Sequence, residues 1–164
     1  MLLRDELQIT RSLEPGQELL LSVLLTREQV SRISDDRLFK PAGITDQQFN
    51  VLRILKGGPA EGYLIREIRK RMISRSADVP RLVDRMMRAG LVQRCEDPTD
   101  RRGSLVRLTE QGAALEAKLG PVHTALCREM AQVLAPEDTQ AVCALLQQLR
   151  DGIRNRLVGG ADPA

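Results

Sequence analysis

The side chains best suited to binding chemistry are arginines set at helical spacing in the middle of the chain. Arg81, Arg85 and Arg88 share one side of a helix, because residues three and four apart lie on the same face. Guanidinium groups donate hydrogen bonds in a planar fork that matches guanine edges and phosphate oxygens. A helix with such a face is therefore a candidate for lying in the major groove of DNA. From the helix alone, a solvated surface helix is an equally good interpretation.

The opposite side of the same segment is apolar. Five residues recur at i, i+3, i+4, i+7 and i+8, which is the pattern of a buried helix face: Val79, Leu82, Val83, Met86 and Met87. The ring of Pro80 prevents the helix from beginning much before Ser76, so Ser76 or Asp78 is expected to cap it. Gly90 is predicted to end the helix in the left-handed conformation, with Leu91 folding back onto it.

Two β-rich runs, residues 91–96 and 104–109, follow that glycine and are joined by the loop DPTDRRG. Proline, aspartate and glycine favour a tight turn, and the adjacent arginines give it a basic tip. A helix followed by a basic hairpin is typical of a winged helix, whose wing reaches a minor groove or the phosphates. The candidate DNA-contacting residues are then Arg75, Ser76, Asp78, Arg81 and Arg85, together with Asp100, Arg101 and Arg102 in the loop.

The string D-x-x-D-R-R-G-x-x-V-x-L-T-x-x-G, from Asp97 to Gly112, resembles the wing signature of the MarR family of bacterial winged-helix repressors. The preceding RLVDRMMRAGLVQR resembles that family's recognition helix and first wing strand, although Pro80 stands where members often carry Thr. The resemblance extends from about residue 20 to 157. It implies a homodimer that binds double-stranded DNA at a pseudo-palindromic operator and releases it when a small amphipathic or aromatic effector binds.

Composition favours a mainly α fold with a small β-wing. Aromatic residues make up only 2% of the 164 residues, so the core must be built from aliphatic side chains, which favours packed helices. Residues 61–109 contain 12 Lys/Arg against 7 Asp/Glu, whereas the remainder contains 13 against 15. This uneven charge suits one nucleic-acid-facing lobe and one neutral lobe. We expect a single domain with a winged helix-turn-helix lobe at about 41–112.

The flanking regions, about 2–39 and 113–157, are predicted to be dimerisation helices. A short helix is expected within 2–10, a long one from Pro15 to Phe39 that KPAG breaks, and another that Thr45 and Gln48 cap. Further helices are expected from Tyr63 to Met72, after Thr109 with a bend at Gly120-Pro121, and after Pro136, before a disordered tail at 158–164. The first half of the long helix is apolar nearly all round, which indicates contact with a second subunit.

The last helix carries a regular apolar stripe, in which Leu145, Leu149 and Ile153 are the predicted dimer contacts. An effector would then occupy a crevice between the dimerisation helices and the winged lobe, as the resemblance implies. With few aromatic residues, an aliphatic pocket formed by the first long helix and the helix after the wing is the expected site.

The sequence offers no catalytic or metal-binding constellation, so we expect neither an enzyme nor a cofactor. His123 is the only histidine and has no cluster of cysteines or carboxylates near it in sequence. Three widely spaced cysteines, no long apolar run and no signal-like start favour a reduced, cytoplasmic protein without membrane contact.

Two alternative functions remain open from the sequence. A thiol sensor could use Cys95, which lies between Arg94 and Glu96, whereas Cys127 and Cys143 are predicted to be packed thiols. A winged helix that only contacts other proteins is the second alternative. The adjacent Arg101 and Arg102 argue against it, because a basic tip suits the potential of a minor groove.

Overall fold

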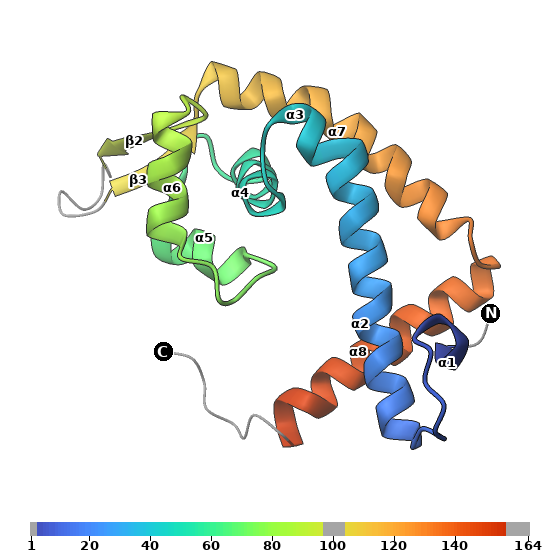
Figure 1. The fold of residues 1–164 in the computed structure, drawn as a ribbon. Helices are drawn as coiled ribbons and strands as arrows, with labels where there is room; N and C mark the ends of the chain where they lie inside the picture. The colour runs from blue at the N-terminus through green and yellow to red at the C-terminus, as the bar shows by residue number, and fades with distance from the viewer. Residues whose placement is uncertain (1–2, 97–103, 157–164) are drawn as a thin grey trace. The chain divides into compact units, whose positions relative to one another are not determined.

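The chain is mainly helical with one small antiparallel sheet (Figure 1), which confirms the predicted fold class. The structure is a computed structural model that describes residues 3–96 and 104–156.

Its contacts divide the chain into two compact units, residues 1–121 and 122–164. The first unit holds the winged lobe, and the second holds the end of α7 and all of α8. The elements are α1 (Leu3–Glu6), α2 (Pro15–Ser34), a π-helical turn (Asp35–Phe39), α3 (Lys40–Ala42), α4 (Asp46–Lys56), β1 (Tyr63–Leu64), α5 (Ile65–Arg71), α6 (Val79–Arg88), β2 (Val92–Glu96), β3 (Ser104–Leu108), α7 (Glu110–Ala131) and α8 (Pro136–Arg156).

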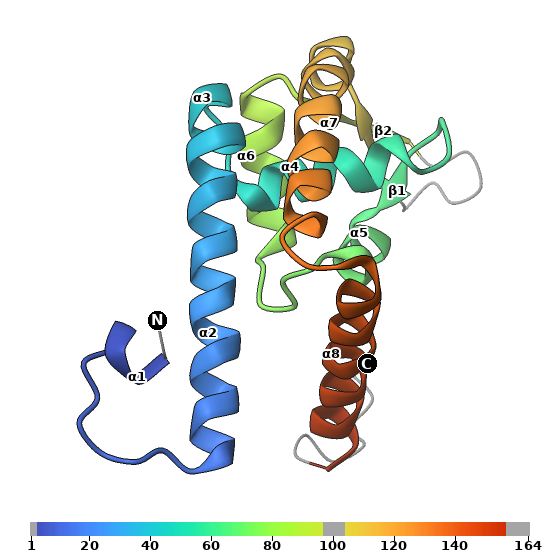
Figure 2. The ribbon, with the colours of Figure 1, turned by 90° about the vertical axis from the view of Figure 1, so that its right-hand side faces the viewer.

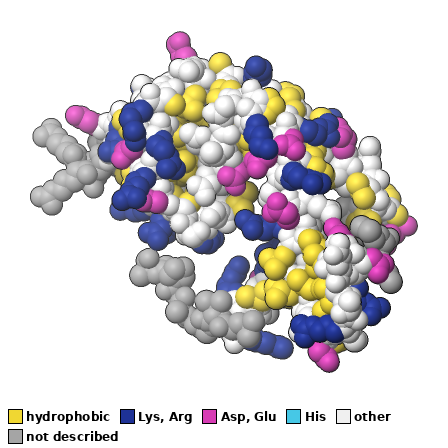
Figure 3. All heavy atoms as spheres, viewed as in Figure 1, with side chains coloured by type: hydrophobic (Ala, Val, Ile, Leu, Met, Phe, Trp, Pro, Cys, Tyr) yellow, Lys and Arg dark blue, Asp and Glu magenta, His cyan; other side chains and the backbone are white. Residues whose placement is uncertain are grey.

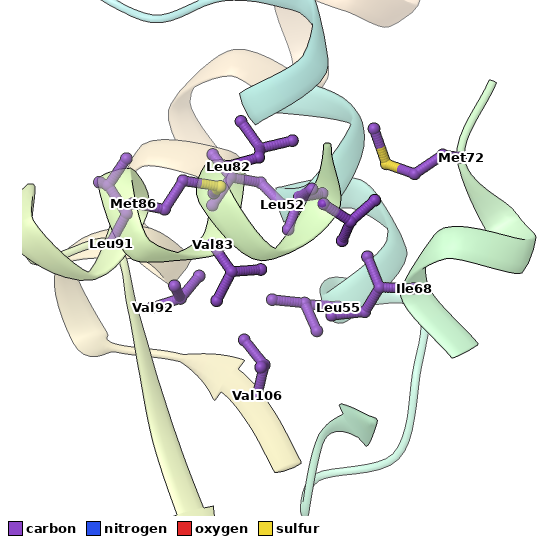
Figure 4. Close-up of a cluster of buried hydrophobic side chains, with 12 residues drawn as sticks. Leu52, Leu55, Ile68, Met72, Leu82, Val83, Met86, Leu91, Val92 and Val106 are labelled. Atoms are coloured by element: carbon purple, nitrogen blue, oxygen red, sulfur yellow. The ribbon is translucent and has the colours of Figure 1, made fainter. Parts of the chain in front are cut away.

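The core of the first unit lies between α4, α5, α6 and the sheet. In Figure 4 the aliphatic side chains of these elements point toward one another, with Val83 of α6 and Leu55 of α4 above Val106 of β3. Leu52, Ile68, Leu82 and Met86 are also almost completely buried in this cluster. Burying these side chains is the main favourable contribution to the lobe, at about 1.5–3 kcal/mol each. This packing fixes α6 against α5 and so builds the helix-turn-helix.

The sheet has the strand order β1-β3-β2, and both pairings are antiparallel. The two predicted wing strands are confirmed, with Val92 opposite Leu108 and Glu96 opposite Ser104. The expected helix from Tyr63 was wrong at its start, because Tyr63 and Leu64 pair with Val106 and Leu105 as β1 and the helix begins at Ile65. Gly62, at φ +100, makes this possible, since a Cβ there would lie 2.2 Å from the carbonyl oxygen of Val106.

The long helical segment ends within KPAG as predicted, but at Gly43 and not at Phe39. Lys40, Pro41 and Ala42 remain helical as α3, which continues α2 (Figure 2). The chain then turns at Gly43, whose φ is 66°. The π-helical turn lies just before Pro41, and in it the N–H of Lys40 donates to the carbonyl of Asp35, five residues earlier. Such a turn interrupts the regular α-helical hydrogen bonds, which join residues four apart. Lys40 Nζ also donates to Asp36 Oδ1 at 2.6 Å, and this hydrogen bond lowers the pKa of the Asp36 carboxyl.

The predicted helix starts at Thr45 and Thr109 are confirmed. Thr45 Oγ1 accepts the N–H of Gln48 at 3.2 Å, while Gln48 Oε1 accepts the N–H of Thr45 at 2.9 Å. Thr109 Oγ1 accepts the N–H of Gly112 at 3.0 Å and donates to the carbonyl of Gly90 at 2.6 Å. The second cap therefore ties the start of α7 to the end of α6. Helix α7 continues through Pro121 as one helix.

Helices α2 and α8 both expose apolar side chains. No residue of α2 is buried, and Leu19, Leu20 and Leu24 are about half exposed. In the second unit no residue of α8 is buried either, and Leu145 is 63% exposed. Cys127 and Cys143 are exposed as well, so the prediction of packed thiols was wrong.

Candidate nucleic-acid interface

Helix α6 is fixed at both ends by its own sequence. Asp78, rather than Ser76, is the N-cap, and its Oδ1 accepts the N–H of Arg81 at 3.2 Å. At the other end Gly90, at φ 70°, donates its N–H to the carbonyl of Met87 at 2.9 Å. The N–H of Leu91 bonds to the carbonyl of Met86, also at 2.9 Å. This pair of bonds is a Schellman motif, which satisfies the last carbonyls of the helix as the sequence predicted.

The buried face of α6 consists of Val79, Leu82, Val83 and Met86, none more than 1% exposed. Met87, predicted to lie on the same face, is 36% exposed. Eight residues on from Val79, it stands about 80° round the helix and so falls at the edge of the stripe. Ala77, just before the N-cap, is partly buried against the core.

The opposite face of α6 presents its arginines to solvent. Arg81, Arg85 and Arg88 are all exposed. Arg81 Nε lies 3.2 Å from Asp78 Oδ2, so the N-cap carboxylate also holds this guanidinium near the start of the helix. Arg88 Nε donates to the backbone carbonyl of Asp84 at 3.3 Å. In Figure 3 the Lys and Arg side chains gather over the region where Figure 1 places α5 and α6.

A second group of basic residues lies on α5 and the turn that follows it. Arg71 is 4.2 Å above the ring of Tyr63, and Arg75 Nη1 donates to the carbonyl of Lys70 at 2.8 Å. Arg75 and Ser76, two of the predicted contact residues, are exposed on this turn. That turn is tied to α4 because Asn50 Oδ1 accepts the N–H of Ile73 at 2.9 Å, a contact that the sequence did not reveal. The other exposed basic residues of α5 are Arg66, Arg69 and Lys70.

The wing strands lie beside α6. Arg94 Nη2 of β2 donates to Asp84 Oδ1 of α6 at 2.9 Å. Cys95 is partly buried, and its Sγ lies 3.7 Å from the carbonyl oxygens of Glu61 and Leu105. The predicted contact residues Asp100, Arg101 and Arg102, and the predicted tail at 158–164, lie outside the described residues.

Within residues 3–96 and 104–156, no group of three or more His, Cys, Asp and Glu side chains could hold a metal ion. His123 has its ring nitrogens 3.7 and 3.8 Å from Cys127 Sγ, one helical turn along α7. None of the described helices is both long and apolar enough to cross a membrane.

A helix-turn-helix whose second helix exposes arginines, followed by an antiparallel hairpin, defines the winged helix-turn-helix class. A model of the MarR family matches residues 42–103. The regulator MhqR of Bacillus subtilis is 28% identical over 109 residues, which cover 65% of this chain and 72% of that protein.

Two solved structures resemble most of the chain. A MarR variant of E. coli complexed with operator DNA is 28% identical, with a TM-score of 0.67 over 77% of this chain and 89% of that one. The PcaV regulator of Streptomyces coelicolor, complexed with its natural ligand, shares the fold at 20% identity, with a TM-score of 0.70 over 87% and 98%. Residues 42–103 thus match the MarR family, and most of the chain shares the fold of MarR-family transcriptional regulators.

Proposed function

We propose that this regulator is a repressor that binds a pseudo-palindromic operator as a homodimer and is released by a small-molecule effector. The observation that carries the proposal is α6, a helix capped at both ends with its arginines on the face away from the core. A helix fixed in this way can enter a major groove without further ordering, so little conformational entropy is lost on binding. The operator complex of the E. coli relative supports this use of the winged helix.

A second copy of the chain is the proposed cover for the exposed apolar stripe of α8. Leu145 is 63% and Ile153 42% exposed, and Leu149 lies between them on the same face. A twofold dimer would present two copies of α6, and half-sites one helical turn of DNA apart would then form a pseudo-palindrome. The exposed leucines of α2 are the second apolar surface that dimerisation would cover.

The proposed effector site is a groove of about 450 Å³ in the first unit. Ala89 and Leu91 at the end of α6 and Ala114 and Leu115 of α7 form an apolar surface, and Lys118 supplies a cation. The remaining lining residues are Ala42, Gly43, Ile44 and Gln111. Such a groove suits a small amphipathic anion. Because Ala89 is the C-cap of α6, an effector bound in the groove would touch the end of α6. It could therefore shift the population of the protein away from the form that binds DNA.

The groove can be tested with benzoate as the simplest aromatic anion. Lys118→Ala is expected to weaken benzoate binding about tenfold, because a charge-assisted hydrogen bond to the carboxylate is lost. Isothermal titration measures the effect, and neutral benzamide, which lacks the carboxylate, should bind both proteins equally. Equal benzoate affinity for the two proteins would remove Lys118 from the site.

Arg81→Ala tests whether α6 reads bases. A bidentate contact to guanine discriminates by about 1–3 kcal/mol, so the variant should lose that much on the selected duplex and accept other bases at one position of each half-site. A dimer uses Arg81 twice, so the loss on the full operator should be about double that on one half-site. An equal loss on selected and scrambled duplexes would make Arg81 a phosphate contact instead.

Transcription in vitro tests repression and release. Genomic fragments captured by the protein serve as templates, and added protein is expected to lower the yield of transcripts that start within them. An anion that binds the groove should restore the yield in the wild type and not in Lys118→Ala. Fragments that are captured but transcribed more strongly would establish an activator instead.

A further inference from the structure

One carboxylate lies among the arginines on the exposed face of α6. Asp84 follows Arg81 by three residues and precedes Arg88 by four, so all three share that face. Its side chain is 52% exposed, and a carboxylate near DNA phosphates is repelled by them. A negative charge in this position therefore needs an explanation beyond solvation.

The explanation lies in the wing. Arg94 Nη2 donates to Asp84 Oδ1 at 2.9 Å, and the Arg94 side chain is 40% exposed. Among the described residues, this is the only side-chain hydrogen bond or ion pair that joins α6 to the wing strands. Asp84 thus forms its ion pair with a residue of the wing and not with an arginine of its own helix.

Strand geometry accounts for the pairing. Successive side chains of a strand point to opposite faces, so Val92 and Arg94 share the face of β2 that is turned toward α6. Val92 is buried in the core, whereas Arg94 lies one repeat further along β2, opposite the buried Val106 of β3, and is itself exposed. The ion pair continues the attachment of β2 to α6 beyond the apolar contacts.

We propose that Asp84 and Arg94 are positioning residues, whose ion pair holds the wing strands at the angle to α6 that lets both contact DNA at once. The proposal rests on the proposed use of α6 and the wing on one operator half-site. When two elements bind together, the second contact is effectively intramolecular, and its contribution falls if the elements are not held in register. The pair thus acts through the protein's own geometry and not by touching DNA.

This role predicts the sign of a charge effect. Asp84→Ala removes a negative charge from a DNA-binding face, so simple electrostatics predicts tighter binding. The positioning role predicts the opposite, a loss of operator affinity of about threefold or more, and a similar loss in Arg94→Ala. The double variant should bind the operator no more weakly than either single variant, because each single substitution already breaks the whole ion pair. Glu96→Ala is the matched control, since it removes an exposed carboxylate from β2 and should bind as tightly as the wild type or more tightly.

Two further measurements separate positioning from direct contact and from damage to the fold. A phosphate contact by Arg94 would lower the slope of log K against log salt by about one unit, whereas the positioning role leaves the slope of Arg94→Ala unchanged. The melting temperatures of both single variants should match the wild type, because the pair is exposed. Hydroxyl-radical footprints should weaken over the part of the half-site that the wing protects, and persist under α6.

The outcomes distinguish this proposal from the proposed function. Tighter operator binding by Asp84→Ala, or additive losses in the double variant, would overturn the positioning role while wild-type binding still supported the repressor. A wild type that binds no duplex selectively would instead overturn the proposed function.

Discussion

Leu145→Glu is expected to convert the proposed dimer into a folded monomer that binds the proposed operator at least about a hundredfold more weakly. Leu145 is 63% exposed, so a glutamate there is solvated in a single chain and leaves the chain's own packing intact. In the proposed interface the same charge would be buried against apolar side chains, which is strongly unfavourable. The loss of affinity follows because two half-sites are no longer held by one molecule.

Light scattering and operator titration measure the two parts of this result. Gln147→Glu is the matched control, because Gln147 is exposed on the same helix but lies away from the apolar stripe. It should remain a dimer with wild-type affinity. A Leu145→Glu protein that keeps its dimeric mass would show that the α8 stripe is not the interface.

Gly112→Ala is expected to destabilise the winged lobe by about 3 kcal/mol, which corresponds to about 6–12 °C in Tm. A Cβ at this position would lie 1.9 Å from the carbonyl oxygen of Leu91. That oxygen cannot turn aside as a side chain could, because it accepts the N–H of Thr109 at 3.2 Å. The start of α7 must therefore move away from the end of α6, and the Thr109 cap would be strained.

Thermal unfolding measures this effect, with Gly57→Ala as the control in the same lobe. Gly57 has a negative φ, and a Cβ there would make only ordinary contacts with the Arg53 and Ile54 carbonyls, so its Tm should stay close to that of the wild type. If Gly112→Ala unfolded at the wild-type temperature, the close approach of α7 to Leu91 would be contradicted.

Local signals made most of the lobe predictable from sequence. The buried stripe of α6, the Gly90 stop, and the caps at Thr45 and Thr109 each depend on residues within one or two helical turns. The same is true of the N-cap of α6, because the position of Pro80 restricts it to two candidate residues, of which Asp78 is one. These are interactions that residue type and spacing determine without reference to the rest of the chain.

The features that were missed depend on contacts between distant residues. Strand β1 has only two residues and exists because it pairs with β3, some forty residues later. The exposure of Cys127 and Cys143 depends on whether other elements cover α7 and α8. The Asp84–Arg94 pair spans the Gly90 turn, so helical periodicity alone could not reveal it.

The most direct test of the central claim, that α6 and the wing recognise a specific duplex, is a titration of the wild-type protein at several salt concentrations. It compares a duplex selected from genomic fragments with a scrambled duplex of the same composition. We predict that the selected duplex binds at least about a thousandfold more tightly at physiological salt, and that log K falls linearly with log salt for both. Equal affinity for the two duplexes would contradict the claim.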